Sequence, residues 1–275
     1  MTEERPIADE DTAAATGTAA ALEVRHVSKS FGPVQAVRDV SFTVHAGEVL
    51  ALIGDNGAGK STLVKCISGV YAPTSGEILV DGRAAQLHSP SEARAMGIET
   101  VFQDLALVGE QDVATNLFLN REILHPNPVL RWLGWLDKRQ MREETRRILD
   151  QLRIRIPSGT TKVAKLSGGQ RQAIAIGRAV GWGRHVVLLD EPSAALGVEQ
   201  SRHVIELIRT LSSQGVAVLL ISHNMQDVLE SCDRAVVLRH GAKVADMSLE
   251  GVAARDLVDL ITGASSSVGS KPDSA

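Results

Sequence analysis

The hydrophobic positions between residues 22 and 263 fall into short apolar runs separated by longer amphipathic stretches. Three runs, residues 49–53, 186–189 and 216–221, are continuously apolar, which is typical of strands covered by helices on both faces. Further strands are predicted at residues 22–27, 40–44, 77–80, 98–102 and 235–238. Because such strands alternate with helical stretches, we expect an α/β fold around a mostly parallel sheet.

The early strands differ from the later ones, because polar and apolar residues alternate along them. Glycines stand at their turn positions, namely Gly32, Gly47, Gly76 and Gly82. Alternation of this kind indicates a small antiparallel sheet with one solvated face. We expect this sheet to form a subdomain at one side of the parallel core.

Residues 104–184 predict a helical insertion. Within residues 137–152 the spacing of Met141, Ile148, Leu149 and Leu152 is that of one helix face, and charged residues occupy the other. Residues 1–21 and 264–275 are poor in large apolar side chains, and we expect flexible tails there. One folded domain therefore spans residues 22–263.

Composition narrows the function classes. The 275 residues include 29 basic and 33 acidic residues, and the net charge of −4 excludes nucleic-acid binding by bulk charge. The apolar runs are too short to span a bilayer, and the N-terminal residues lack the layout of a secretory signal. Cys66 and Cys232 lie in apolar segments, as reduced packing cysteines do. We expect a cytoplasmic location.

The strongest local motif is a phosphate-binding loop that directly follows the apolar run at residues 49–53. It matches the pattern G-x-x-x-x-G-K-[ST] with Gly54, Asp55, Asn56, Gly57, Ala58, Gly59, Lys60 and Ser61. Backbone N–H groups of such a loop surround phosphate oxygens, and the helix that follows adds the positive end of its dipole. Lys60 is predicted to contact the β- and γ-phosphates, Ser61 to bind Mg²⁺, and Thr62 to contact phosphate.

Two acidic residues, Asp190 and Glu191, end the apolar run at residues 186–189. The carboxyl ends of parallel strands meet at one sheet edge, so both should lie near Lys60. We expect Asp190 to hold the metal and Glu191 to polarise the attacking water. An acidic pair at a strand end is by itself often only a solvated turn, and the phosphate loop upstream favours the catalytic interpretation.

Two further polar residues follow predicted strands at this edge. His223 follows the run at residues 216–221 and is predicted to contact the γ-phosphate, although a lone histidine also fits an ordinary surface residue. Gln103 follows the run at residues 98–102 and could bind metal or water. Taken alone, a single glutamine is a weak signal.

A second candidate anion site opens the helix that runs through Ile174 and Ile176. Ser167 is placed at the N-cap, and Gly168 and Gly169 expose backbone N–H groups beside Gln170. Taken alone, Ser-Gly-Gly fits a capped turn as well as a ligand site.

In their order and spacing, the phosphate loop, Gln103, residues 166–170, Asp190-Glu191 and His223 resemble the nucleotide-binding domain of ATP-binding cassette (ABC) transporters. The resemblance covers residues 22–263. It implies a P-loop NTPase fold with a RecA-like core, and an ATPase that uses ATP and Mg²⁺. It further implies a head-to-tail homodimer in which Ser167 and Gly169 of one copy close over the ATP held by Lys60 of the other. Phe31 matches the aromatic residue that stacks on adenine.

Within this family the chain is similar to monosaccharide importers of the ribose, xylose and fructose kind, and most similar to the single-cassette fructose type. The segments that carry this likeness are residues 54–57, 101–107, 116–119 and 191–197. It implies a subunit on the cytoplasmic face of the membrane that works with separate permease subunits and, indirectly, a sugar-binding protein. Gly197 stands where most members of the broader cassette family have an aspartate that reaches across the dimer, a departure that the sugar group commonly tolerates.

The sequence also predicts a partner contact and leaves alternatives open for one segment and for the function. Residues 103–121 are predicted to contact the permease, because they follow the γ-phosphate-sensing Gln103. The apolar segment at residues 128–136, with two tryptophans, could cap a partner surface, but we favour packing against the helix at residues 137–152. A cassette ATPase of DNA repair or translation, or a regulatory scaffold with negligible turnover, would be the alternative functions. The near-neutral net charge counts against the DNA repair or translation ATPase, and Glu191 counts against the scaffold with negligible turnover.

Overall fold

The computed structural model describes residues 20–181 and 185–264. The predicted tails lie outside these residues except for Ala20 and Ala21, which begin β1, and Ala264. The strands are β1 (Ala20–Phe31), β2 (Val34–His45), β3 (Val49–Gly54), β4 (Ser75–Val80), β5 (Arg83–Ala84), β6 (Ile98–Val101), β7 (Val186–Asp190), β8 (Ala217–Ile221), β9 (Arg234–Arg239) and β10 (Ala242–Ser248).

Helices of very different length connect these strands. They are α1 (Lys60–Ile67), α2 (Pro90–Ala95), α3 (Val113–Leu117), α4 (Pro128–Trp132), α5 (Lys138–Gln151), α6 (Gly168–Val180), α7 (Val198–Ser213), α8 (Met225–Ser231) and α9 (Ala254–Thr262), with a 3₁₀ turn η1 (Val163–Lys165). In the part of the chain described, no helix combines the length and apolar character needed to cross a bilayer.

Two sheets organise the molecule. The larger has the order β10-β9-β3-β8-β7-β6, in which all neighbouring pairs are parallel except β10 with β9. The smaller is antiparallel, with the order β2-β1-β4-β5. The predicted α/β fold, with its parallel core and small antiparallel sheet, is confirmed.

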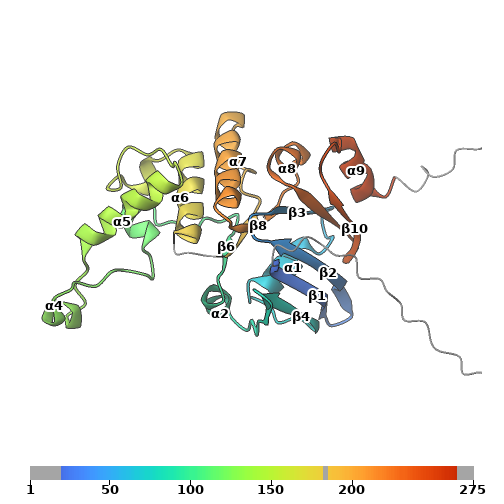
Figure 1. Cartoon of the computed structure of the whole chain (residues 1–275), viewed down its shortest axis with the longest axis horizontal. Coiled ribbons are helices and arrows are strands. Elements are labelled where there is room, and N and C mark those ends of the chain that lie inside the picture. Colours follow the sequence, from blue (N-terminus) through green and yellow to red (C-terminus); the bar gives the residue numbers. More distant parts are fainter. Residues whose placement is uncertain (1–19, 182–184, 265–275) are drawn as a thin grey trace, which may run out of the picture.

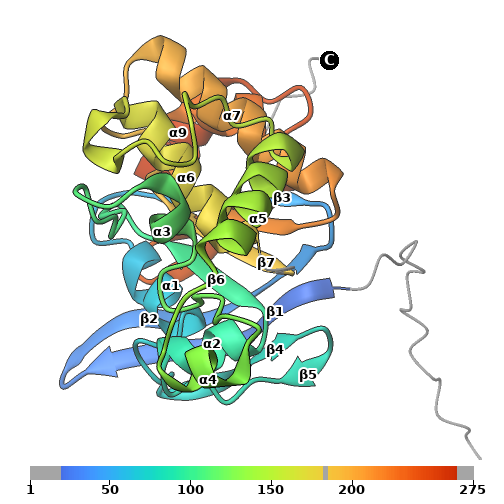
Figure 2. The ribbon, with the colours of Figure 1, turned by 90° about the vertical axis from the view of Figure 1, so that its left-hand side faces the viewer.

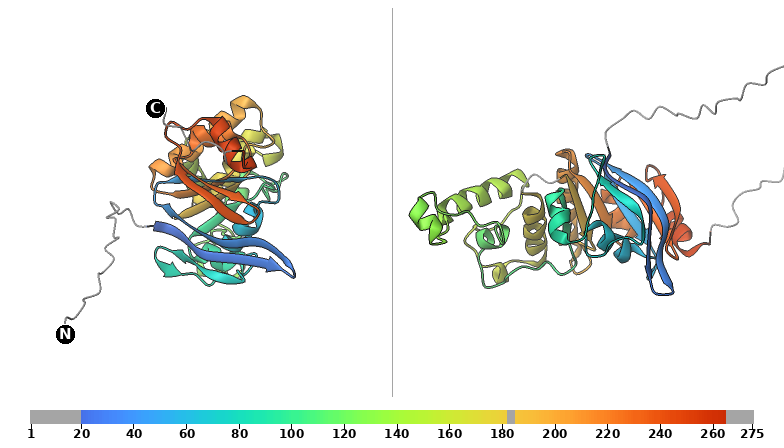
Figure 3. Two further views of the ribbon diagram at one scale, coloured as in Figure 1. Left: turned by 90° about the vertical axis from the view of Figure 1, so that its right-hand side faces the viewer. Right: turned by 90° about the horizontal axis from the view of Figure 1, so that it is seen from below.

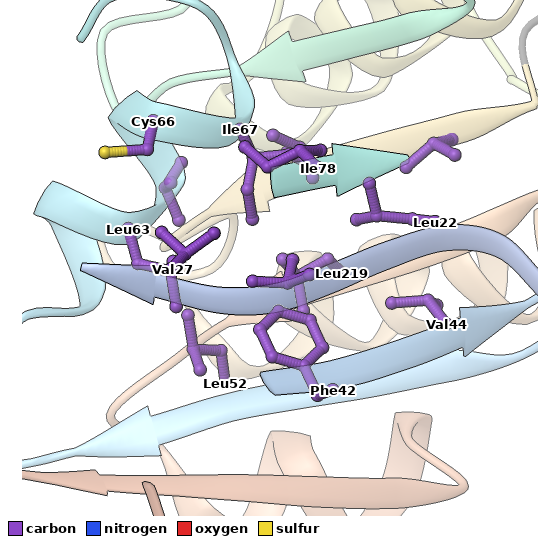
Figure 4. Close-up of a cluster of buried hydrophobic side chains, with 14 of the residues drawn as sticks. Leu22, Val27, Phe42, Val44, Leu52, Leu63, Cys66, Ile67, Ile78 and Leu219 are labelled. Carbon is purple, nitrogen blue, oxygen red and sulfur yellow. The ribbon is translucent and has the colours of Figure 1, made fainter. Parts of the chain in front are cut away.

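The three apolar runs became the central strands β3, β7 and β8, and alternate residues along them explain why. Leu50 and Leu52 of β3 face a core shared with α1 and the antiparallel sheet. Val49, Ala51 and Ile53 face a second core beneath α6, α7, α8 and α9. Figure 1 shows these four helices on one side of the sheet, and Figure 4 shows side chains of the first core, to which Phe42, Leu63 and Leu219 belong.

All the helices and turns between β6 and β7 form one lobe at the end of the molecule opposite the C-terminal elements (Figures 1 and 2). The lobe has its own core, in which Leu117 and Phe118 pack against Met141, Leu149 and Ile174. Helix α5 buries Met141, Thr145, Ile148 and Leu149, the face that the spacing predicted.

Three structural expectations were wrong in detail. β1 and β2 extend well beyond the predicted runs, because a long antiparallel pair continues past the apolar residues. β10 was missed because Lys243 and Asp246 interrupt its pattern at a sheet edge, where one face stays wet. Most of the segment at residues 128–136 does not pack on α5: Val129, Trp132, Leu133 and Trp135 are all exposed, since α4 projects from the lobe, whereas Leu136 packs against the core of the lobe.

Candidate functional site

The phosphate loop joins the end of β3 to the start of α1. Gly54, Gly57 and Gly59 all have positive φ, a backbone conformation that side chains disfavour. At Gly59 a Cβ atom would lie 2.5 Å from the carbonyl oxygen of Ala36, so the loop passes too close to β2 for any other residue. Gly59 is also the N-cap of α1 and has no side chain to cap it, which leaves the first N–H groups of the helix for a ligand.

Lys60 bridges the loop. Its Nζ donates hydrogen bonds to the carbonyl oxygens of Gly54 at 2.7 Å and Asp55 at 3.0 Å. Burial lowers the pKa of Lys60, while the nearby Glu191, Asp55 and Asp190 carboxylates oppose that shift. The ammonium group is therefore held in the loop where an anionic ligand would restore its lost solvation. Ser61 and Thr62 follow in the first turn of α1.

The two acidic residues occupy the predicted edge. β7 is parallel to β8, and Asp190 pairs with Ile221, the last residue of β8. Burial raises the pKa of Asp190, and the charge of Glu191 raises it further. Glu191 itself adopts a left-handed conformation, and its N–H donates to the carbonyl oxygen of Ile221 at 2.9 Å. The turn after β7 is thereby fixed to the end of β8.

His223 completes this cluster. Its Nδ1 lies 2.7 Å from Oε2 of Glu191. The His223 side chain is 70% exposed and that of Glu191 only 19%, so the imidazole can reach a ligand while it remains in contact with the carboxylate. Gln103 lies two residues beyond β6 and lines one pocket together with Glu191 and Gly168.

The donors present fit a magnesium ion bound together with phosphate. Mg²⁺ takes oxygen ligands and keeps several of its waters, so one carboxylate and one hydroxyl suffice beside phosphate oxygens. Asp190 supplies a half-buried carboxylate whose charge a cation would stabilise, and Ser61 a hydroxyl on the adjoining helix. Among the described residues, no group of three or more His, Cys, Asp or Glu side chains could hold a metal by itself.

The helix start at Ser167 is built differently. Ser167 caps α6 by accepting from the N–H of Gln170, whose side chain accepts from the N–H of Ser167 in return. Gly168 and Gly169 allow close packing: a Cβ atom on Gly168 would lie 3.0 Å from the side chain of Leu196, which precedes α7, and one on Gly169 would lie 3.1 Å from that of Gln200 in α7. This capping box lies in the helical lobe, whereas Lys60 begins α1 on the other side of the sheet (Figure 1).

Phe31 ends β1 and is 43% exposed. Its ring meets that of Tyr71 edge-on with centroids 5.2 Å apart, and Nζ of Lys29 lies 5.2 Å from the Phe31 centroid. Tyr71 was missed by the sequence reasoning; it follows α1, and the only signal was that the chain has a single tyrosine.

Arg178 on α6 was also missed. Its guanidinium donates to the carbonyl oxygens of Leu105 and Ala106, both at 2.8 Å. The pKa of Arg178 is lowered, and burial of the guanidinium is the largest cause. The segment that follows Gln103 is thus fastened to the helix that begins beside Ser167. No pattern in the sequence distinguished this arginine from the other basic residues.

Comparison with known proteins agrees with this geometry. A family model described as "ABC transporter" matches residues 37–194. The chain belongs to the ABC transporter family. A nucleotide-free ATP-binding cassette from an ABC transporter has the same fold, with a TM-score of 0.74 and 26% identity, and the match covers 87% of this chain and 95% of that one. The family and fold predictions are therefore confirmed.

Two curated members of the family cover nearly the whole chain. The xylose/arabinose import ATP-binding protein XylG of Sulfolobus acidocaldarius is 44% identical over 88% of this chain and 93% of its own length. The fructose import ATP-binding protein FrcA of Rhizobium meliloti is 43% identical over 88% of this chain and 94% of its own.

Proposed function

We propose that this ABC family member is the ATP-hydrolysing subunit of a monosaccharide importer, in which two copies close around ATP and drive separate permease subunits. The observation that carries the proposal is the convergence of Lys60, Asp190, Glu191 and His223 at one sheet edge, with Glu191 and His223 in contact. A monosaccharide as the transported substrate is supported by the import proteins for xylose/arabinose and for fructose, which are 44% and 43% identical to this chain.

Binding of ATP uses the loop and α1. The N–H groups from Asp55 to Gly59 surround the phosphates, and Lys60 exchanges its two carbonyl acceptors for β- and γ-phosphate oxygens. Phe31 stacks on adenine, and Tyr71 sets the angle of its ring. Ser61, Asp190 and Gln103 hold Mg²⁺, which when bound neutralises charge on the β- and γ-phosphates. Thr62 contacts phosphate beside Ser61.

Hydrolysis uses the contact between Glu191 and His223. The Glu191 carboxylate accepts a proton from the water whose oxygen attacks the γ-phosphorus, while the bond to the β–γ bridging oxygen breaks and ADP leaves. His223 orients this carboxylate through Nδ1 and leaves Nε2 directed to a γ-phosphate oxygen. Water is therefore activated only when a triphosphate is in place.

Ser167, Gly168, Gly169 and Gln170 complete the site of a second copy. The capping box leaves the N–H groups of Gly168 and Gly169 unused, and these groups and the α6 dipole lie in the helical lobe rather than at the start of α1, so they suit the triphosphate of a head-to-tail partner. Two equivalent ATP sites follow from two identical chains. Loss of the γ-phosphate removes the link and opens the dimer.

Coupling to the permease passes through residues 103–121 at the cytoplasmic face of the membrane. Arg178 fastens Leu105 and Ala106 to α6, so a shift of Gln103 toward the γ-phosphate would move this segment and α6 together. A permease element that rests on the segment would feel both ATP binding and dimer closure.

The test begins with a search of the neighbouring genes for a permease and a sugar-binding protein, which are then reconstituted with this chain in proteoliposomes. We expect ATP hydrolysis that rises with the sugar-loaded binding protein, together with sugar uptake that requires ATP. Hydrolysis stimulated by DNA ends or ribosomes, with no response to the permease, would contradict the proposal and favour a soluble cassette ATPase. Nucleotide binding without turnover would favour a regulatory scaffold.

A further inference from the structure

The outermost part of the helical lobe is a closed hairpin at residues 124–136, which we call the tryptophan hairpin. Leu124 and Leu136 form a β-bridge at its base, and the N–H of His125 donates to the carbonyl oxygen of Trp135 at 2.8 Å. The side chain of Asn127 caps α4, and Pro128 occupies its first turn. The conformation of α4 and its turn is therefore fixed by hydrogen bonds within the hairpin, while Leu136 at the base packs against the core of the lobe.

This fixed conformation displays apolar side chains to solvent. The exposed fractions are 64% for Val129, 85% for Trp132, 56% for Leu133 and 60% for Trp135. The chain has only three tryptophans, and two of them stand here. An ordered, capped helix with no buried residue gains little for folding, and contiguous exposed apolar surface of this kind marks a binding surface.

Positive charge accompanies the apolar residues. Residues 125–142 contain four basic residues and one acidic residue, a net charge of +3 in a chain of net charge −4. The basic residues are Arg131 in α4 and Lys138, Arg139 and Arg142 in α5; Asp137 is occupied as the N-cap of α5. Of these, Arg139 is paired with Glu143 at 3.2 Å.

The exposed apolar residues and the basic residues lie at different distances from the rest of the molecule. α4 lies at the far end of the molecule and α5 leads from it back toward the sheets (Figures 1 and 3). The helix that carries Trp132 and Arg131 thus lies further out than the start of α5, where Lys138, Arg139 and Arg142 follow. A bilayer surface presents the matching order, with acyl chains beneath a layer of anionic headgroups, and tryptophan favours the boundary between them.

We propose that the tryptophan hairpin is a membrane contact that inserts Trp132, Leu133 and Trp135 into the headgroup boundary of a bilayer containing anionic lipid. Arg131, Lys138 and Arg142 contact the anionic headgroups. This contact needs neither ATP nor the permease, and so goes beyond the proposed transport function. It would hold the helical lobe against the bilayer through the ATP cycle.

The test is flotation of the full chain with vesicles of phosphatidylcholine alone and of phosphatidylcholine mixed with phosphatidylglycerol. We expect binding to the mixed vesicles that weakens as salt is raised. The double variant Trp132→Ser/Trp135→Ser should bind at least about tenfold more weakly, because two large apolar side chains no longer leave water. The matched control Val244→Ser/Val258→Ser also replaces two exposed apolar residues, 41% and 45% exposed, and should bind like the wild type.

Two more measurements sharpen the test. Lys138→Gln/Arg142→Gln should weaken binding to the mixed vesicles, and brominated lipid should quench the tryptophan emission of the wild type. Unchanged ATP hydrolysis by the hairpin variants shows that they are folded. The proposal is overturned if the wild type does not float with anionic vesicles, or if the double tryptophan variant floats equally well. It is also overturned if that variant loses only its association with the permease in detergent or with a second copy.

Discussion

Nδ1 of His223 lies 2.7 Å from Oε2 of Glu191, although 32 positions separate the two residues in the chain. The contact follows from strand register, because Asp190 pairs with Ile221 and each polar residue stands just beyond its strand. The left-handed backbone at Glu191 turns its side chain back toward β8. Glu191, which we propose as the base, and His223, which we propose to orient it, are thus held by the same parallel strand pair.

Replacing His223 tests this relationship. We expect His223→Ala to lower the maximal rate of ATP hydrolysis about 100-fold, because the carboxylate loses its orienting partner and the γ-phosphate a donor. The affinity for ATP should change little. Phosphate-release and nucleotide-binding assays separate the two effects. His203→Ala, on the exposed face of α7, is the control and should hydrolyse ATP normally; full activity of His223→Ala would contradict the assigned role.

Two glycines of the phosphate loop allow a controlled test of how the loop affects the free energy of unfolding. Gly57 and Gly59 both have positive φ, but only at Gly59 would a Cβ atom meet backbone, 2.5 Å from Ala36. We expect Gly57→Ala to cost about 1 kcal/mol of unfolding free energy, and Gly59→Ala more than about 2 kcal/mol, since the clash adds to the backbone strain. Urea denaturation measures both. Equal losses of unfolding free energy in the two variants would show that β2 can move away from the loop at no energetic cost.

Two variants of Ser167 distinguish its role as the cap of α6 from its proposed role in dimer formation. Ser167→Arg should abolish ATP-dependent dimers and steady hydrolysis, because the bulky cation enters the space assigned to a second copy's triphosphate. Ser167→Ala removes the cap alone, which costs about 1 kcal/mol, and should still dimerise. Nucleotide binding by the monomer should be the same in both, as measured by calorimetry. If the arginine variant lost nucleotide binding as well, the residue would serve the fold and not the dimer.

The two buried cysteines predict that the free energy of unfolding decreases at alkaline pH. Burial raises the pKa of Cys66 to about 11 and that of Cys232 to about 12. An unfolded thiol loses its proton near pH 9, so between about pH 9 and about pH 11 the unfolded state binds fewer protons and stability falls as pH rises. Cys66→Ala/Cys232→Ala should flatten this slope in urea denaturation. The same slope in the variant, or rapid alkylation of the native thiols near neutral pH, would disagree with the burial.

The sequence predicted the central strands and the sheet edge at which the candidate site residues meet, because each rested on a strong local pattern. Strands β3, β7 and β8 are apolar on both faces, and short apolar runs of this length bounded by turn residues are typical of covered strands. Since parallel strands end at one edge, the position of Asp190, Glu191 and His223 followed from chain position alone.

What could not be predicted depended on contacts between distant residues. Tyr71 meets Phe31 only because the turn after α1 folds back on β1, and Arg178 reaches Leu105 only across the lobe. The tryptophan hairpin was misplaced because an apolar composition does not say which surface will cover it. Hydrogen bonds at its base, and not its apolar residues, decide that it projects.

The central claim is that ATP joins two copies, and Glu191→Gln tests it most directly. This change keeps the side chain's shape but removes the base, so ATP should bind and steady hydrolysis should fall at least about 100-fold. Glu199→Gln, in the first turn of α7, is the control with normal turnover. Light scattering after size exclusion is the measurement: we predict that Glu191→Gln is a dimer with ATP and a monomer without it. A monomer in ATP that hydrolyses at the wild-type rate would contradict both the base and the shared site.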